Sequence, residues 1–449
     1  MKKFAIGLVC LLLAGAAVYL FSHRNGDKAR DAVPADAAAA MVMEPAQLAR
    51  KLGLSPGDIK KFSSALGGLE EGIDLTKPVY AFTTKSGMTG FCLNISDKDK
   101  LRESLEGFGF QEDEEDGLQW IERDDDGICC FDEDKILLCH AASSSETSSL
   151  RSEMSKLMKQ ERQEVKALEN IDGENGELRL TAPMSLLETV SPEIRKSAEL
   201  KGLGDAVLNS AFQVERKALK FKAKLSGAEK LELPLAPIEG NFSGKDSAEP
   251  FFWLCLNIKG EQLLPYLREV PELRSTLLAL NLGVDADMMI KAINGDVLLA
   301  VPKLDLQHPD FILTAKLSDT KFLGNADDWS GVTKRGASDF LFTDASIFFG
   351  TREGNLYITS SESLTNKAFN VNASKGKYLS ASLNVGQLVR AYPAASVLLA
   401  TMPQLREVVD GIDRFSLTAD TQQSLELSLE TKKPVKDIIS NLMTLFSAK

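Results

Sequence analysis

The sequence predicts an α+β protein with two tandem, structurally similar halves, each a mainly antiparallel sheet with helices packed on one face, behind an N-terminal hydrophobic helix. Three observations support this fold class. An apolar strand followed by a helix recurs along the chain, and short apolar runs come in pairs joined by turns. The second half also repeats the first at a spacing of roughly 200 to 230 residues. Hydrophobic periodicity of this kind is the main signal of secondary structure in a sequence.

The strand-then-helix signal begins at Val33–Gly53, where an apolar run leads into residues at helical spacing. The same signal returns at residues 178–187, 253–267 and 379–390. We therefore expect a fold built by repetition of one kind of unit.

The two halves correspond element by element. A helix is predicted to open at Ser55, because serine is a good N-cap and Pro56 suits the first helical position. Its counterpart is Leu282–Met289, which is similar to Leu52–Ile59. Ser-Asp pairs at residues 96–97 and 318–319 both follow an apolar run, where a helix N-cap belongs.

Paired strands joined by short turns favour antiparallel sheets over a parallel α/β fold. Residues 79–84 pair with 91–95 on this reading, 128–131 with 136–139, and 345–349 with 355–359. The order strand, helix, strand, strand, helix, strand is that of a ferredoxin-like sandwich. Thr147–Leu168 is predicted as one helix whose apolar stripe packs in the core.

The predicted domains are residues 1–31 as a signal or anchor segment and spacer, and 32–228 as the first α+β repeat. Residues 229–249 form a linker, and 250–449 the second repeat. The linker prediction rests on several prolines and glycines without periodicity, which is typical of irregular connections.

Phe4–Phe21 is an uncharged apolar run of 18 residues behind Met1-Lys2-Lys3. A membrane-spanning helix needs about 17 to 25 apolar residues, so this run is just long enough. We expect an inner-membrane anchor with an exported, periplasmic domain. The alternative is a cleaved signal peptide that releases the protein into the periplasm, since Ala14-Gly15-Ala16 fits a small-residue cleavage site.

Composition excludes some classes of function. With 44% hydrophobic and 26% charged residues the chain is globular in type. A net charge of −12 argues against nucleic-acid binding, which needs a basic face. Most of this charge is local, because Glu112–Lys135 holds 12 acidic and 2 basic residues.

Three motifs carry a family resemblance: V-P-A-D-A at residues 33–37, G-I-D-L-T-K-P-V-Y at 72–80 and S-D-K-D-K-L at 96–101. With its export segment, the chain is similar to an uncharacterised family of exported proteins of Bacteroidota, classed as a domain of unknown function. The resemblance covers nearly the whole exported region. It implies a cell-envelope location in a Gram-negative organism and brings no catalytic residues. Many such proteins look like lipoproteins, but Cys10 follows Val9 rather than a small residue.

The sharpest candidate site is Glu122–Glu133, with acids at loop positions 1, 3, 5 and 12 and glycine at 6, the spacing of a calcium-binding EF-hand. Strands rather than helices are predicted on both sides, and the second half has no matching acids. Turn chemistry at a hairpin tip explains the same residues. We therefore assign no metal ligands.

Histidine and cysteine chemistry is poorly represented. The three histidines are His23, His140 and His308, too few and too scattered for a triad. His140 lies beside a cysteine, but the spacing is not that of a zinc site. Two S-x-x-K matches, at Ser318 and Ser374, lack the partner motifs of penicillin-binding enzymes. Beyond the anchor the cysteines are expected to be core thiols, with one disulfide near the hairpin of residues 129–139 as the alternative: Cys92, Cys129, Cys130, Cys139 and Cys255.

We expect a membrane-tethered cell-envelope protein that acts as a non-enzymatic binding or scaffold module. No catalytic or cofactor-binding residue is assigned, and no cofactor is expected. The partners would be the membrane, through Phe4–Phe21, and a protein of the envelope, with no nucleic acid. The alternatives are an envelope or glycan hydrolase that uses carboxylates, and a calcium-binding exported protein. A deep pocket where carboxylates converge would favour the hydrolase.

Overall fold

The computed structural model describes residues 27–54, 72–106, 111–123, 127–140, 147–161, 163–186, 203, 205–228, 232–240, 242, 249–281, 283–304, 310–343, 345–365, 371, 373–391, 397 and 399–447. The chain forms two compact units: residues 1–228 with 433–449, and residues 229–432. The predicted anchor, Phe4–Phe21, and the predicted helix at Ser55 lie outside the described residues. Within those ranges, no helix has the length and apolar character needed to cross a membrane.

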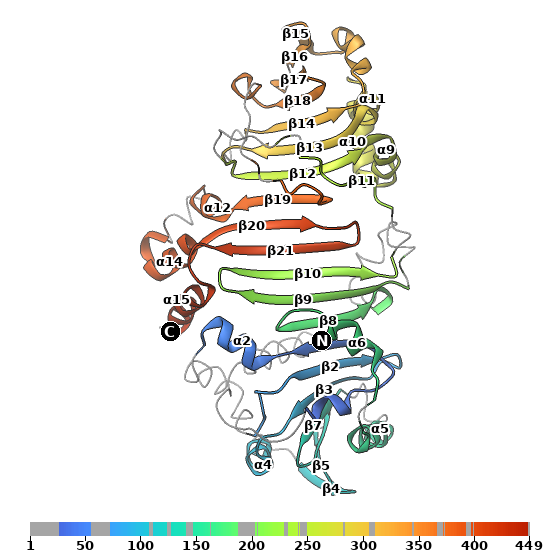
Figure 1. The fold of residues 1–449 in the computed structure, drawn as a ribbon, viewed down its shortest axis with the longest axis vertical. Helices are drawn as coiled ribbons and strands as arrows, with labels where there is room; N and C mark the ends of the chain where they lie inside the picture. The colour runs from blue at the N-terminus through green and yellow to red at the C-terminus, as the bar shows by residue number, and fades with distance from the viewer. Residues whose placement is uncertain are drawn as a thin grey trace. The chain divides into compact units, whose positions relative to one another are not determined.

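The first unit contains one fully antiparallel sheet (Figure 1). Strands that are neighbours in the sheet are mostly neighbours along the chain: the first strand pairs with the second and the second with the third. The order of strands across the sheet is therefore not that of the predicted ferredoxin-like sandwich. In spatial order the strands are β4 (Gln111–Glu115), β5 (Leu118–Arg123), β6 (Gly127–Phe131), β7 (Lys135–Cys139), β3 (Thr89–Asn94), β2 (Val79–Thr84), β1 (Ala37–Met43), β8 (Leu178–Pro183), β9 (Val207–Glu215) and β10 (Ala218–Ser226).

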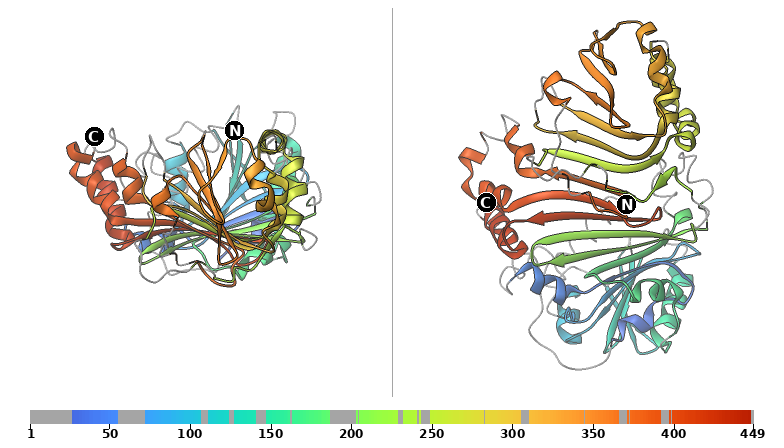
Figure 2. Two further views of the ribbon diagram at one scale, coloured as in Figure 1. Left: turned by 90° about the horizontal axis from the view of Figure 1, so that it is seen from above. Right: turned by 45° about the horizontal axis from the view of Figure 1, so that its top comes forward.

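Helices cover both faces of this sheet, which corrects the prediction of one covered face (Figure 2). On one face lie η1 (Ala29–Ala32), α5 (Thr147–Lys159) and α6 (Lys166–Asp172). On the other lie α2 (Pro45–Leu52) and α4 (Lys98–Glu106). Successive residues of a strand point to opposite faces, and Cys92 and Leu93 on β3 are both 0% exposed. The central strands are therefore buried on both sides.

Local chemistry explains where several elements of the first unit begin and end. The Asp97 carboxylate accepts the backbone N–H of Lys100 at 3.1 Å and caps α4, as the sequence predicted. Helix α2 ends at Gly53, whose φ of 70° needs a residue without a side chain. The turn between β6 and β7 is held by Asp132, which accepts the N–H groups of Asp134 and Lys135 at 2.8 Å each.

The helix predicted over Thr147–Leu168 is two helices, α5 and α6. The chain leaves the helical path after Lys159, where the Gln160 side chain donates to the backbone carbonyls of Asp31 at 2.6 Å and Val33 at 3.3 Å. Val165 is extended and precedes α6. The apolar stripe of both helices is in the core, as expected.

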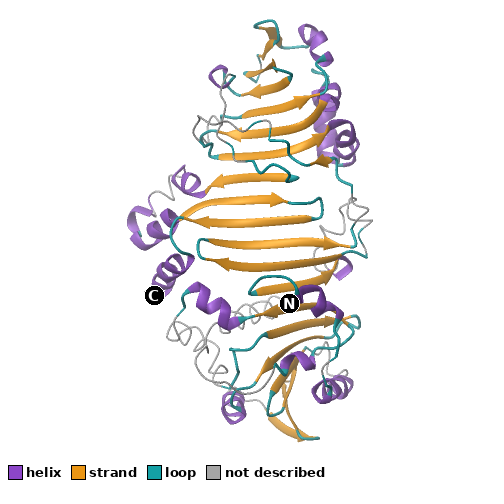
Figure 3. Cartoon of the chain, viewed as in Figure 1, coloured by secondary structure: helices purple, strands orange, loops and turns teal. Residues whose placement is uncertain are grey.

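The second unit also holds an antiparallel sheet, whose strands are orange in Figure 3. Its strands are arranged across the sheet in the order that corresponds to the first unit. In spatial order they are β15 (Val332–Lys334), β16 (Asp339–Phe342), β17 (Ile347–Arg352), β18 (Asn355–Thr359), β14 (Ile312–Leu317), β13 (Ile293–Val301), β12 (Phe252–Lys259), β19 (Leu379–Asn384), β20 (Ile412–Ala419) and β21 (Ser424–Thr431).

Part of the predicted linker, residues 229–249, belongs to the second unit. The short strand β11 (Leu235–Ala236) pairs with β12. Ile238 is 1% exposed, and the Asp296 carboxylate accepts the N–H groups of Glu239 at 2.9 Å and Gly240 at 2.7 Å. The sequence predicted a linker here because the segment has no periodicity. Its conformation depends instead on contacts with distant residues such as Asp296.

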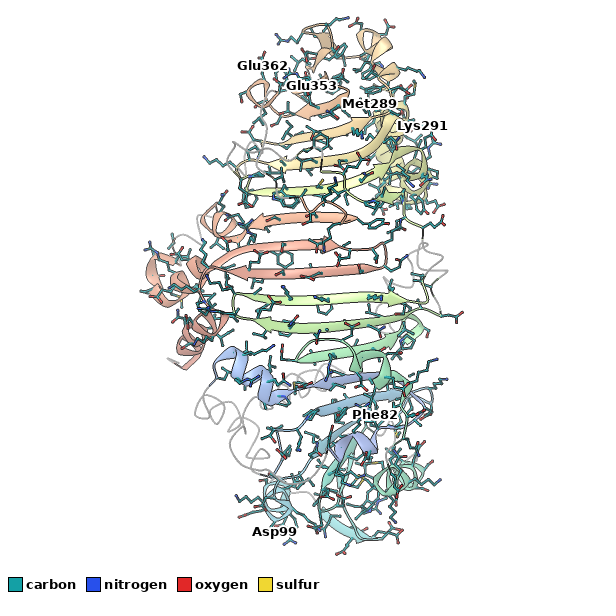
Figure 4. The ribbon with its side chains drawn as sticks, viewed as in Figure 1. Phe82, Asp99, Met289, Lys291, Glu353 and Glu362 are labelled. Carbon is teal, nitrogen blue, oxygen red and sulfur yellow. The ribbon has the colours of Figure 1, made fainter. Side chains whose placement is uncertain are left out.

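Helices also flank the second sheet. Met289 and Lys291 extend from α11 (Figure 4), and Met289 packs against the core cluster that contains Phe322 and Leu356. The helical elements whose bounds the structure gives in this unit include α9 (Gly260–Glu269), α10 (Pro271–Leu280), α11 (Ala286–Ala292), η5 (Lys321–Asp328), η6 (Glu362–Leu364), α12 (Val385–Ala391) and α14 (Pro403–Gly411).

The C-terminal helix α15 (Val435–Ser447) packs with the first unit, although the sequence placed residues 250–449 in the second repeat. The Val435 N–H donates to the carbonyl of Arg216 at 2.9 Å. A Cβ atom built on Gly53, at the end of α2, would lie 2.7 Å from Cβ of Lys436. The last segment of the chain is therefore part of the first unit's core.

Candidate functional site

A pocket of about 790 Å³ opens in the first unit between the β4–β5 hairpin and α5. Its size is in the range of small-molecule sites. It is lined by one aromatic residue and by charged or polar residues: Glu115, Asp116, Trp120, Arg151, Ser152, Ser155, Lys156, Lys159 and Gln160.

Helix α5 supplies one wall because its sequence is amphipathic. Residues three and four apart on a helix lie on the same face. The apolar stripe, Leu150, Met154, Leu157 and Met158, is buried against the sheet. This leaves a polar stripe at positions i, i+3, i+4 and i+7 for the pocket: Ser152, Ser155, Lys156 and Lys159.

The hairpin supplies the opposite wall. Asp116 and Gly117 have φ values of 58° and 78°, the two left-handed residues of a two-residue hairpin turn. This turn reverses the chain between β4 and β5 and leaves acidic residues at the hairpin tip. The tip therefore faces the cations of α5.

Three ion pairs connect the two walls. Arg151 contacts Asp113 at 3.1 Å and Glu115 at 3.6 Å, and Lys159 contacts Asp116 at 2.9 Å. The Glu115 and Asp116 side chains remain 64% and 71% exposed, so each pair contributes at most about 1 kcal/mol. Part of the acidic segment that dominates the net charge is thus neutralised by α5.

Trp120 forms the floor of the pocket. Trp120 belongs to a row of cross-strand neighbours that starts at Cys92 on β3 and passes through Leu137 and Cys130. Trp120 is 2% exposed, and its Nε1 donor has no hydrogen-bond partner. The Arg151 guanidinium lies 4.9 Å from the ring centroid, a cation–π contact. An unpaired buried donor costs about 1–3 kcal/mol of folding free energy.

Lys156 is the cation of the polar stripe that remains available. It is exposed and lines the pocket, and no residue in the described ranges forms a hydrogen bond or ion pair with it. Arg151 and Lys159, by contrast, are engaged by hairpin acids. The pocket therefore offers donors to a ligand, from an ammonium group and from the serine hydroxyls.

The pocket does not present the paired carboxylates that a glycoside hydrolase requires. Such enzymes place two carboxyl groups across the scissile bond. Glu115 and Asp116 are adjacent in the chain, and each contacts a cation of α5.

The EF-hand-like spacing at Glu122–Glu133 spans two hairpins. Residues 124–126 lie outside the described residues. The backbone of Glu122 pairs with Ile128 at the start of β6, whereas Glu133 lies in the turn after β6 and contacts Lys98 at 2.7 Å. At about 3.3 Å per residue, β6 separates the first and last positions of the loop by roughly 15 Å.

The five described cysteines are free and buried. The alternative, a disulfide near the hairpin of residues 129–139, is not found among them. Cys129 is opposite Leu138 and Cys139 is opposite Ile128, so the Cys129 and Cys139 thiols lie on opposite faces of the sheet. Burial, with a smaller contribution from the nearby Glu153 carboxylate, raises the pKa of the Cys139 thiol to about 12. Burial likewise raises the pKa of Cys255 to about 12. These thiols behave as core residues.

The remaining candidates are not assembled into sites. His23 and His308 lie outside the described residues, and in the described ranges no group of histidine, cysteine and acidic side chains could hold a metal ion. The Ser318 hydroxyl donates to the Ala292 carbonyl at 3.1 Å. Lys377, of the second S-x-x-K match, forms an ion pair with Asp420.

The sequence analysis did not single out the pocket. The signal was present in the helix predicted from Thr147, where the polar residues between the apolar ones recur at the same spacing. A polar stripe on an amphipathic helix is usually just a solvated face. Only the position of the β4–β5 hairpin makes it one wall of a pocket.

No family model matches the sequence, and no curated protein matches it. Among solved structures, "Structure of crystal form III of TP0453" is 14% identical, with 43% of this chain and 78% of that chain covered and a TM-score of 0.29. Crystal form I of TP0453 is 12% identical, with 48% and 84% covered and a TM-score of 0.28. Likeness at this level decides neither the fold nor the function.

Proposed function

We propose that this chain is a membrane-tethered protein of the cell envelope that acts as a non-enzymatic binding or scaffold module. The apolar run Phe4–Phe21 behind two lysines supports the tether. The resemblance to an exported family of Bacteroidota supports a periplasmic location of the remaining chain. A cleaved signal would give the same compartment without the anchor.

One observation favours binding over hydrolysis: the pocket at α5 holds its carboxylates in ion pairs with the facing helix. Asp116 contacts Lys159 at 2.9 Å, and Glu115 contacts Arg151 at 3.6 Å. A carboxylate that acts as nucleophile or base must reach its substrate. The donors left over, above all Lys156, suit recognition.

We also propose that the two units arose by tandem duplication of one α+β unit. Three consecutive strands occupy the centre of the sheet in each unit, β1–β3 in the first and β12–β14 in the second, and each pairs with the next. The four strands that follow along the chain form a meander on one side, next to β3 and β14. The last three strands extend the other side in both units. A shared strand order across ten strands is not expected of unrelated sheets.

Location and binding can be tested together on the full chain. Cells expressing the protein are fractionated, washed at alkaline pH and treated with protease from the periplasmic side. We expect the protein in the inner-membrane fraction and accessible to protease, because 18 apolar residues resist extraction. A Leu12→Arg, Val18→Arg variant should leave the membrane. Recovery of the unaltered chain in the cytosol would overturn the proposal.

Crosslinking in the same membranes tests the binding role. A partner that crosslinks to the unaltered chain should be lost with Lys156→Glu and retained with Lys166→Glu, which makes the same charge change on α6 outside the pocket. Purified protein that hydrolyses envelope glycans, with activity lost in Asp116→Asn, would show an enzyme instead.

A further inference from the structure

The pocket between α5 and the β4–β5 hairpin contains more hydrogen-bond donors than acceptors available to a ligand. Its acids, Glu115 and Asp116, already contact Arg151 and Lys159. Trp120 Nε1 has no acceptor, and no partner of Lys156 occurs in the described ranges. A ligand that complements these groups must bring acceptors and negative charge.

The positions of these donors narrow the ligand to a small anion. Lys156, Ser152 and Ser155 lie within one turn on one face of α5, so a single group with two or three oxygens can reach them together. Lys159 lies one turn further along the same stripe and adds a second positive charge. Charge-assisted hydrogen bonds of this kind are the stronger ones.

We propose that this pocket binds a small molecule through one carboxylate or phosphate group held by Lys156, Ser152 and Ser155, an assignment that rests on the proposed binding role. Lys159 contributes the second cation by partly releasing Asp116, whose side chain is 71% exposed and so loses little when it returns to water.

The test uses the full chain in detergent, with inorganic phosphate and succinate as two separate probes at constant ionic strength. Melting temperature and tryptophan emission are followed up to 10 mM of each probe. A ligand at ten times its dissociation constant should raise the melting temperature of a unit this size by roughly 2–4 °C. Saturation with one probe only identifies whether the group is a phosphate or a carboxylate.

Matched variants assign the effect to the pocket. Lys156→Gln removes the charge but keeps a polar side chain, and we expect it to weaken binding at least tenfold. Ser155→Ala should weaken binding less, and Lys166→Glu on α6 should leave it unchanged. Because the affected residues are exposed or half-buried, the melting temperature without probe should stay the same.

Two results would overturn the assignment. One is the absence of a saturable shift with either probe at 10 mM, and the other is undiminished binding by Lys156→Gln. Neither result bears on the membrane fractionation or the crosslinking, so a failure of this assignment is distinguishable from a failure of the proposed envelope role.

Discussion

At the scale of single residues, close contacts explain why a particular position must be glycine. Gly260 begins α9, and a Cβ atom at this position would lie 1.8 Å from the carbonyl oxygen of Ile290. Any other residue would push α9 away from α11. Gly324, in the same unit, has open space around it. The sequence does not distinguish these two glycines, and only the structure shows that the packing of α9 requires Gly260.

The buried thiols predict a pH dependence of stability. Burial raises the pKa of Cys139 from about 9 in the unfolded chain to about 12 in the folded unit. The thiol is protonated in both states below pH 9, so its contribution is fully present there. Above pH 9 the unfolded state loses its proton first, and stability falls by about 1.4 kcal/mol per pH unit until pH 12.

Urea unfolding at pH 8 and pH 10 measures this contribution, followed by the emission of Trp120 with Trp253 and Trp329 replaced by Phe. Cys139→Ala should lose less stability between the two pH values than the parent, by about 1 kcal/mol. Ile128→Val, on the strand neighbour of Cys139, is the control, because it removes a methyl group without a titrating one. Equal losses in parent and Cys139→Ala would rule out the assigned cause.

At the scale of elements, helix caps were the features that the sequence predicted best. The Ser-Asp pair before α4 was read as an N-cap, and Asp97 accepts the N–H of Lys100. The matching pair in the second unit precedes the 3-10 helix η5. There Asp319 accepts the N–H of Lys321 at 3.0 Å, but the N-cap residue is Thr320, whose side chain makes no capping hydrogen bond. A cap depends on residues three apart, so local sequence is enough to specify it.

Asp97→Ala should therefore destabilise the first unit by about 1 kcal/mol, since the N–H of Lys100 loses its acceptor. Asp97→Asn keeps an oxygen at the same place and should stay within about 0.5 kcal/mol of the parent. Urea unfolding followed by Trp120 emission compares the three proteins. Similar stability of Asp97→Ala and the parent would mean that the cap is not maintained in solution.

The β4–β5 hairpin and α5 show the limit of reasoning from elements. The sequence predicted α5 as part of an amphipathic helix and residues 118–121 as a strand, but it did not predict the β4–β5 hairpin. Their ion pair between Asp113 and Arg151 joins residues 38 positions apart. Such a distance is invisible to periodicity, and the candidate site was missed for that reason.

At the scale of the whole molecule, the division of the chain into units does not follow its linear order. Residues 433–449 return to the first unit after the second is complete. Val435 and Ile438 are buried there, and the helix that carries them packs against α2. A tandem reading of the sequence cannot foresee this return, because an apolar face on α15 fits a partner in either unit.

Ile438→Ala tests which unit α15 stabilises. Ile438 is 6% exposed, so truncation should cost about 2–4 kcal/mol. We expect the loss in the unfolding transition of the first unit, reported by Trp120, and not in that of the second, reported by Trp253. The exposed Asp437→Ala is the matched control on the same helix. A shift confined to the Trp253 transition would place α15 with the second unit.

The sequence by itself determined the local structure of this protein: strand β1 followed by α2, strand β12 followed by α9, the caps, and the hairpin of β6 and β7. These features depend on residues within a few positions of each other. The tertiary structure alone decided that helices cover both faces of the first unit's sheet, that α5 and α6 are separate, that α15 joins the first unit, and that a pocket lies beside Trp120. Each of these depends on contacts between distant residues, where one apolar or charged face can be matched by several partners and packing selects among them.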